Sequence, residues 1–268
     1  MGDMLRFTVL GCGSSPGTPR IGGHWGACDP KNPKNRRRRC SLPAQRISDA
    51  GTTNVLVDTS PDLREQAMDA GMAILDAVLY THPHADHIHG IDDLRGFVMN
   101  MQRRVDVYAD DATMARLMEG FRYCFETPPD SDYPPILNAH AMQAGTELAI
   151  AGPGGTLTAM PITQRHGRMS SLSFRFAGLA YSPDVSGLND AALEALQDLD
   201  VWIVDALRRT PHPSHFSLPE ALAWIDRLKP RRAVLTHMHI DLDYETLRRE
   251  LPANVEPAYD GMTIELPA

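Results

Sequence analysis

The chain has few cysteines, few aromatic residues and no excess of positive charge. Its 268 residues include 4 cysteines, and aromatic residues make up 6% of the chain. A chain of this length can bury a sufficient core without disulfides, so a few scattered cysteines predict a reducing compartment. The formal net charge is −8. This disfavours broad binding to DNA, which requires a basic surface.

Long hydrophobic runs are also missing. No stretch approaches the roughly 18 consecutive apolar residues of a membrane helix, and Met1 to Leu10 lacks the pattern of a signal peptide. We therefore expect a cytoplasmic protein that makes no membrane contact. Hydrophobic residues nevertheless make up 43% of the chain. That is enough for a packed core, and we expect residues 1–268 to form a single α/β domain.

Short apolar strands and amphipathic helices follow one another without strict alternation. Helices are expected over Ser60–Ala70, Gly90–Asn100, Ala112–Glu119, Leu218–Leu228 and Tyr244–Glu250. Strands are expected over Leu5–Gly11, Thr53–Asp58, Ala77–Tyr80, Asp106–Ala109, Val201–Asp205, Ala233–Thr236 and Glu256–Leu266, with three or four more between Glu147 and Tyr181. This order fits an αββα sandwich, in which two mixed sheets pack face to face with helices outside.

A dense group of histidines follows the strand expected at Ala77–Tyr80. It reads His82-Pro-His84-Ala-Asp86-His87. Because the motif stands just past a strand, its side chains should gather at one edge of a sheet. Imidazole and carboxylate groups are suitable ligands for zinc, manganese or iron. The motif therefore predicts a metal site.

Three later polar residues also follow apolar runs. They are His166, Asp184 and His237. Taken singly, each could be an ordinary polar residue at a strand end. The Gly-rich turn Gly11–Gly17 lacks the Gly-Lys-Ser/Thr ending of a phosphate-binding P-loop, so we reject that interpretation.

With these residues in this order, the chain resembles the metallo-β-lactamase superfamily over nearly its whole length. The resemblance implies the αββα fold and two divalent metal ions, zinc or manganese, with iron also compatible. It implies that one ion is held by His82, His84 and His166, and the other by Asp86, His87 and His237. Asp184 would bridge the two ions, and Asp58 would support the site without binding metal.

The resemblance extends to a particular branch of this superfamily. The iron redox branch usually has Glu at the position of His84, so a hydrolase is favoured. The segments Gly11–Gly17 and Pro30–Arg39 resemble phosphoribosyl 1,2-cyclic phosphate phosphodiesterase and the relatives of tRNA 3′-processing ribonuclease. The acidic net charge and the lack of a long basic arm favour a small anionic phosphodiester, cyclic or nucleotide-like, over tRNA.

Two residues are expected to act in catalysis in that branch. His215 would protonate the leaving oxygen without binding metal, and Asp86 would support the attacking water as well as hold metal. Asp205 could orient His215 or act as an ordinary cap, and His212 could lie in the same cavity. The run Arg36–Arg39 could attract an anion, although charge runs are more often solvated surface.

Several alternatives stay open. A thioesterase or lactonase of the same superfamily would use the same ligands, and a non-catalytic metal or cofactor carrier is a third class. His24, Cys28, Cys40 and His239 offer donors for a structural zinc, although the cysteine cluster of the phosphonate-pathway enzyme is not reproduced. A homodimer is compatible with the resemblance.

Overall fold

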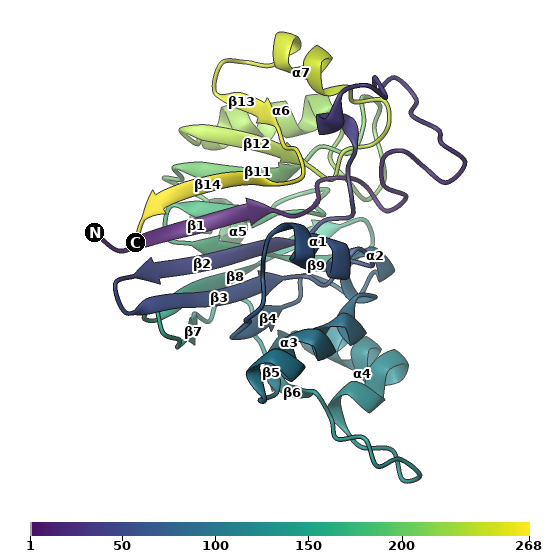
Figure 1. Cartoon of the computed structure of the whole chain (residues 1–268). Helices are drawn as coiled ribbons and strands as arrows, with labels where there is room; N and C mark the ends of the chain where they lie inside the picture. Colours follow the sequence, from purple (N-terminus) through teal and green to yellow (C-terminus); the bar gives the residue numbers. More distant parts are fainter. Residues whose placement is uncertain (1) are drawn as a thin grey trace. The chain divides into compact units, whose positions relative to one another are not determined.

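The structure, a computed structural model, describes residues 2–268. The chain divides into two compact units (Figure 1). The first unit contains the residues up to Leu10 together with Ser41–Thr158 and Thr263–Ala268. The second unit contains Gly11–Cys40 and Ala159–Met262. The single domain expected over residues 1–268 stays a prediction.

The first unit is built on a seven-stranded sheet in the order β14-β1-β2-β3-β4-β5-β6. Its strands are β1 (Met4–Val9), β2 (Leu42–Ser48), β3 (Gly51–Val57), β4 (Ala77–Leu79), β5 (Val105–Ala109), β6 (Leu137–Ala141) and β14 (Met262–Pro267). β1, β2 and β3 pair antiparallel, whereas β3, β4, β5 and β6 pair parallel. This sheet is therefore mixed.

Helices bury the parallel part of this sheet. They are α1 (Leu63–Asp69), α2 (Ala85–Ile88), the 3-10 turn η2 (Ile91–Asp93), α3 (Leu94–Met101) and α4 (Asp111–Phe125). α3 packs on β5, and α4 packs on β5 and β6. All residues of β4 are fully buried, whereas buried and partly exposed residues alternate in β1. This contrast is typical of parallel strands covered by helices and of antiparallel strands with one exposed face.

The second sheet has the order β13-β12-β11-β10-β9-β8-β7. Its strands are β7 (Leu148–Ile150), β8 (Leu157–His166), β9 (Met169–Phe176), β10 (Leu179–Ser182), β11 (Val201–Asp205), β12 (Arg232–Thr236) and β13 (Val255–Pro257). β8, β9 and β10 pair antiparallel, and β10 to β13 pair parallel. This sheet is also mixed, as the sequence predicts.

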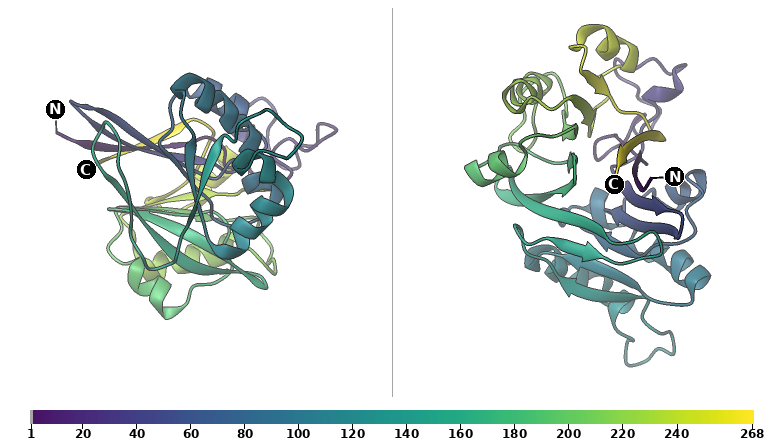
Figure 2. Two further views of the ribbon diagram at one scale, coloured as in Figure 1. Left: turned by 90° about the horizontal axis from the view of Figure 1, so that it is seen from below. Right: turned by 90° about the vertical axis from the view of Figure 1, so that its left-hand side faces the viewer.

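The second unit contains the helices α5 (Asp190–Ala195), α6 (Leu218–Leu228) and α7 (Tyr244–Glu250) and the 3-10 turn η1 (Pro33–Asn35). Figure 2 shows α5 and α6 on one face of the second sheet. α6 begins with a capping box between Ser217 and Glu220 and has Pro219 in its first turn. The residues that it buries lie on one helical face: Leu218, Ala221, Ile225 and Leu228.

Two predicted helices begin later than expected. α3 starts at Leu94 rather than at Gly90, after the 3-10 turn η2, and α1 starts at Leu63 rather than at Ser60. The Ser60 hydroxyl accepts a hydrogen bond from the Asp62 amide and donates one to the Gln66 side chain. These bonds close a turn ahead of the helix. None of the helices within residues 2–268 combines the length and the apolar composition of a membrane-spanning segment.

Candidate metal centre

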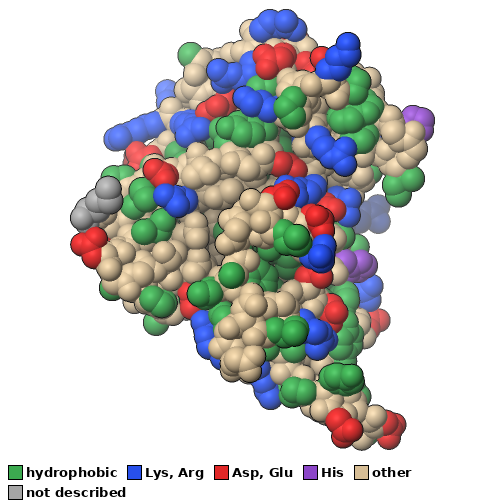
Figure 3. Space-filling view, in the orientation of Figure 1, with side chains coloured by type: hydrophobic (Ala, Val, Ile, Leu, Met, Phe, Trp, Pro, Cys, Tyr) green, Lys and Arg blue, Asp and Glu red, His purple; other side chains and the backbone are tan. Residues whose placement is uncertain are grey.

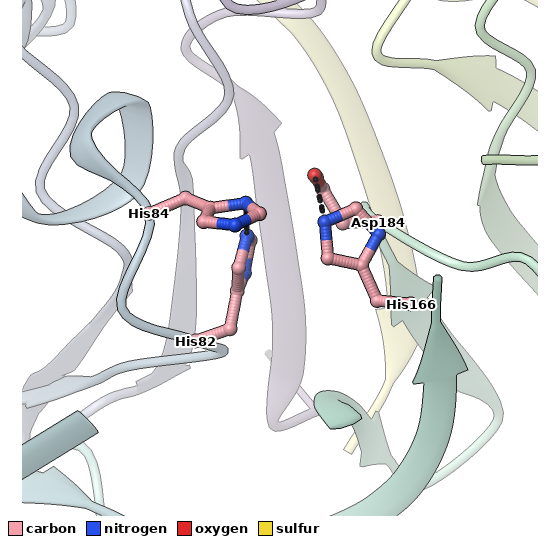
Figure 4. Close-up of side chains that lie close together, drawn as sticks. All are labelled: His82, His84, His166 and Asp184. Atoms are coloured by element: carbon pink, nitrogen blue, oxygen red, sulfur yellow. Dashed lines mark hydrogen bonds and ion pairs between the residues drawn. The ribbon is translucent and has the colours of Figure 1, made fainter. Parts of the chain in front are cut away.

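The histidine motif stands where β4 ends and the short helix α2 begins. His82 and His87 are fully buried, Asp86 is half-buried and His84 is exposed. His84 caps α2, so Asp86 and His87 lie in its first turn. His82 Nε2 lies 3.0 Å from His84 Nδ1 (Figure 4), and His87 Nε2 lies 3.6 Å from Asp86 Oδ2. The first unit therefore brings together all four metal-binding side chains predicted in the motif.

Asp58 organises two of these histidines. It follows β3, is fully buried, and has a left-handed backbone with φ 63°. Its Oδ2 atom accepts from His87 Nδ1 at 2.7 Å and from the Thr81 hydroxyl at 2.8 Å. Because the Thr81 proton is donated to Asp58, the Thr81 oxygen, 2.9 Å from His82 Nδ1, is left to accept from that ring.

This network sets the tautomers of the two rings. With Nδ1 protonated in His82 and His87, the Nε2 atoms keep the lone pairs that a metal ion requires. Burial raises the pKa of the Asp58 carboxyl, and the hydrogen bonds from His87 and Thr81 act in the opposite direction. Asp58 therefore has the contacts of a supporting acid.

The second unit gathers three predicted site histidines around the carboxylate of a fourth predicted residue, Asp184. His166 ends β8, Asp184 follows β10, His237 follows β12, and His215 lies ahead of α6. Asp184 Oδ2 lies 3.6 Å from His166 Nε2 and 3.8 Å from His215 Nε2, and Asp184 Oδ1 lies 3.6 Å from His237 Nε2. All four side chains are buried. Figure 4 shows the pair His166 and Asp184.

These separations suit a metal ion. Two ligand atoms that each lie about 2.0–2.2 Å from one ion, at a tetrahedral angle, are about 3.4 Å apart. The nitrogen–oxygen distances around Asp184 are close to this value. Asp184, His215 and His237 also form one group of potential ligands whose donor atoms lie within 4.8 Å of one another. The donor set of the second unit thus fits a divalent cation.

Asp205 has in the second unit the role that Asp58 has in the first. It ends β11, is fully buried, and accepts from His215 Nδ1 at 2.7 Å through Oδ2. Its Oδ1 atom lies 3.9 Å from His237 Nδ1. His166 Nδ1 donates to the Ser214 carbonyl at 2.6 Å. Of the two interpretations left open for Asp205, the structure supports orientation of His215.

Two other histidines lie outside this pattern. The His212 ring lies 5.2 Å from the His215 ring, and burial together with the nearby His215 lowers the pKa of His212. His140 lies in β6, where it contacts Asp106 at 3.0 Å and stacks on Tyr108. His212 therefore borders the cluster, and His140 has a cross-strand structural role.

The residues considered for a structural zinc do not form a cluster. Among residues 2–268, no group of three or more metal-capable side chains includes His24, Cys28, Cys40 or His239. The buried side chain of Arg37 contacts two of these residues instead: it donates to Cys28 Sγ and to the His239 carbonyl. The run Arg36–Arg39 is therefore not a uniformly solvated surface.

Comparison with known proteins identifies the family. Residues 53–238 match the family model described as a β-lactamase superfamily domain. The match covers more than half of the chain, so the chain belongs to this superfamily. The crystal structure of a diphosphatase from the PhnP family is 35% identical to it, covers 98% of this chain and 97% of its own, and has a TM-score of 0.87. The expected fold, superfamily and branch are confirmed.

More distant structures share the fold. Zn²⁺-bound PqqB from Methylobacterium extorquens is 16% identical, covers 97% of this chain and 100% of its own, and has a TM-score of 0.73. The short form of human tRNase Z is 16% identical, covers 97% of this chain and 98% of its own, and has a TM-score of 0.62. At these identities the likeness concerns the fold alone.

One curated relative has a different kind of name. The octanoyltransferase of Porphyromonas gingivalis (strain ATCC BAA-308 / W83) is 33% identical over 263 residues. The match takes in 96% of this chain but 51% of that protein. The chain therefore spans about half the length of this curated relative.

Some contacts around the candidate site have no signal in the sequence. Thr81 stands next to the motif, and only its hydrogen bonds reveal that it links Asp58 to His82. The Ser214 carbonyl that holds His166 is a backbone group, which no residue pattern predicts. The burial of Arg37 had no signal either, since its three arginine neighbours look identical in the sequence.

Proposed function

We propose that this protein is a metal-dependent hydrolase that uses two divalent ions, zinc or manganese, to cleave a small phosphodiester. The observation that carries the proposal is the convergence of three imidazole Nε2 atoms on Asp184, with the Nδ1 atoms of His215 and His166 held by acceptors. Superfamily membership and the similar PhnP-family diphosphatase support hydrolysis.

Seven side chains would hold the ions. His82, His84 and His166 would bind one, Asp86, His87 and His237 would bind the other, and Asp184 would bridge both. When bound, the ions would act as Lewis acids and lower the pKa of water in the site. The half-buried Asp86 carboxylate would also accept a hydrogen bond from the attacking water.

His215 is proposed as the general acid. Its Nδ1 atom keeps its proton and donates it in a hydrogen bond to Asp205. Nε2 is therefore the atom that would exchange protons with the substrate. In the protonated ring, Nε2–H would be donated to the leaving oxygen, and the buried Asp205 carboxylate would stabilise the imidazolium. The proton then passes to the alcohol product, and the ring returns to its neutral form.

The substrate is proposed to be a small cyclic phosphate or a nucleotide-like phosphodiester. The surface charge supports a small molecule over a nucleic acid. On the face shown in Figure 3, basic and acidic side chains are interspersed. Several arginines form ion pairs with neighbouring acids, including Arg95 with Asp92 and Arg116 with Glu119. Such paired surfaces lack the basic stripe that phosphate backbones require.

The cytoplasmic location and the homodimer stay predictions.

A thioester or lactone hydrolase is the second candidate. The relative named octanoyltransferase favours it, because acyl groups are carried as thioesters or amides. That protein is about twice as long as this chain, so its other half could carry the named activity. The same ligands would serve ester chemistry.

A substrate panel separates the two candidates. Protein reconstituted with manganese or zinc would be assayed with bis-p-nitrophenyl phosphate, 2′,3′-cyclic nucleotides, a cyclic phosphoribose, an acyl thioester and a lactone. Phosphodiester turnover that His215→Ala abolishes supports the first proposal. Turnover of the thioester or lactone alone, in protein with two bound ions, would replace it with the second.

A further inference from the structure

The backbone of His237 is held in an uncommon conformation. Its φ is 56°, in the left-handed region that a residue with a side chain seldom adopts. His237 follows β12 directly, and its ring lies among Asp184, Asp205 and His215. Such a conformation persists only where the surrounding structure fixes it. The contacts of the following residues are therefore important.

The residues after His237 are fixed by backbone hydrogen bonds. The Met238 amide donates to the Cys12 carbonyl at 2.8 Å, and the Ser14 amide donates to the Met238 carbonyl at 3.1 Å. The His239 amide donates to the Leu207 carbonyl at 2.9 Å. The Gly-rich turn therefore supports the chain beside His237.

The Arg37 side chain bridges the turn formed by residues 239–242. Its side chain is buried, with 1% exposed, although it carries a positive charge. Its Nη2 atom donates to the Leu242 carbonyl at 2.6 Å and to Asn35 Oδ1 at 3.3 Å, and its Nη1 atom lies 3.4 Å from the His239 carbonyl. One planar guanidinium thus joins both ends of the segment 239–242, where the Leu242 amide also donates to the His239 carbonyl.

The neighbours of Arg37 hold its guanidinium fork, the two Nη donors, in place. Its own backbone pairs with Thr18 through two hydrogen bonds of 2.9 Å. Asn35 Oδ1 also accepts from the Tyr244 amide, and Asn35 Nδ2 donates to Asp243 at 2.7 Å. A buried charge is costly unless it is hydrogen-bonded, and the oxygens of Asn35, His239 and Leu242 accept from the two Nη atoms of Arg37. The buried Nε atom has no hydrogen-bond partner within residues 2–268.

We propose that Arg37 is a positioning residue that holds the backbone of His237 in its metal-binding conformation. This inference rests on the proposed metal site. A lysine cannot reproduce the effect, because an ammonium group lacks the planar fork that reaches two carbonyls at once. Loss of the fork should loosen residues 238–242 and weaken the ion held by His237. The ion held by His82, His84 and His166 should keep its affinity.

The test compares Arg37→Lys with Arg36→Lys. Both variants keep the charge, and Arg36 is an exposed neighbour in the same run. Metal affinity is measured by chelator competition, and hydrogen exchange of the Met238 and Leu242 amides is measured in metal-free protein. We expect Arg37→Lys to weaken one of the two ions about 10- to 100-fold, the range for residues that orient metal ligands. Its two amides should exchange faster, and Arg36→Lys should match the wild type.

The outcomes separate this inference from the proposed function. If the wild type binds two ions and Arg37→Lys binds both with unchanged affinity, the positioning role is wrong and the metal site stands. If exchange rises without loss of metal affinity, Arg37 only stabilises the fold, and the proposal is again overturned. A wild type that binds no ion would overturn the proposed function and this inference together. Arg37→Met, measured in the same way, should lose as much affinity as Arg37→Lys.

Discussion

His215 and Asp205 are joined by a 2.7 Å hydrogen bond from His215 Nδ1 to Asp205 Oδ2. The same Oδ2 atom also accepts from the Val185 amide at 3.1 Å, so two hydrogen bonds fix this oxygen of the carboxylate. The ring is therefore held with Nε2 toward Asp184. An imidazole that is oriented by a buried carboxylate has the arrangement expected of a general acid or base, which is the role proposed for His215.

Replacement of His215 by alanine should abolish most activity without loss of metal. The ring is proposed to protonate the leaving oxygen, and such groups contribute about 10²–10⁴-fold. We expect kcat to fall within this range while metal analysis still finds two ions per chain. His212→Ala, the matched control three residues away, should retain most of the activity. Loss of an ion in His215→Ala would instead make His215 a ligand.

Replacement of Asp205 by asparagine should act through the orientation of His215. An amide can donate as well as accept, so it can stabilise the ring with its proton on the wrong nitrogen. We expect kcat to fall more than about tenfold with KM little changed. The pH profile of kcat, measured in parallel, should no longer show the ionisation of the His215 imidazole. An unchanged pH profile would contradict the orienting role.

Asp58 should control metal affinity. Its carboxylate fixes His87 directly and His82 through Thr81. Loss of such a supporting acid typically weakens metal binding about 10- to 100-fold, and we expect the metal affinity of Asp58→Asn to fall by a factor in this range. Asp130→Asn, in an exposed loop, is the control. Equal affinities in the two variants would show that the network does not tune the site.

Asp260 should make stability depend on pH. Burial raises its pKa to about 6, although hydrogen bonds from Arg38 and Cys12 act to lower it. The pKa in the unfolded chain is about 3.9. The native state therefore binds this proton more tightly than the unfolded chain does. The contribution of Asp260 to the free energy of unfolding is complete below about pH 4 and is lost as the pH rises through about 6.

Denaturant unfolding between pH 4 and 7 measures this effect. We expect the free energy of unfolding of Asp260→Asn to rise relative to the wild type as the pH increases across this window. The comparison between the two proteins removes the contributions of other groups. Parallel curves for the two proteins would mean that Asp260 has an ordinary pKa.

Removal of metal should abolish activity and lower the melting temperature. Ions that bind only the native state stabilise it by mass action, so apo protein is expected to melt at a lower temperature. Restoring zinc or manganese should restore both properties. Calorimetry with and without a chelator checks the stability, and the panel assay checks the activity. A chelator-resistant activity in metal-free protein would exclude the proposed chemistry.

Residue order predicted much of the fold. α6 and α7 have the predicted bounds because their apolar residues follow helical spacing and their ends are marked by Ser217, Asp243 and Pro230. β2 (Leu42–Ser48) was missed, since it begins with Leu-Pro and continues with Gln and Arg. β6 was missed for a similar reason, because its Asn138 and His140 side chains bond to Asp106 rather than form an apolar pattern.

The candidate ligands could be predicted from the sequence, but the residues that hold them in place could not. His166 ends a strand, and His82, Asp184 and His237 each follow one, so the apolar runs ahead of them marked their places in the sequence. The role of Asp205 depends on a single distance to His215, and the role of Arg37 depends on burial among carbonyls. Both are consequences of tertiary packing, which residue spacing does not determine.

The most direct test combines metal analysis with phosphodiester turnover in one preparation of the full chain. We expect two divalent ions per chain, hydrolysis of a small phosphodiester, and loss of turnover in His215→Ala with both ions retained. Two ions without any phosphodiester turnover, together with hydrolysis of a thioester or lactone, would contradict the phosphodiesterase. A wild type that binds no ion would contradict the metal centre itself.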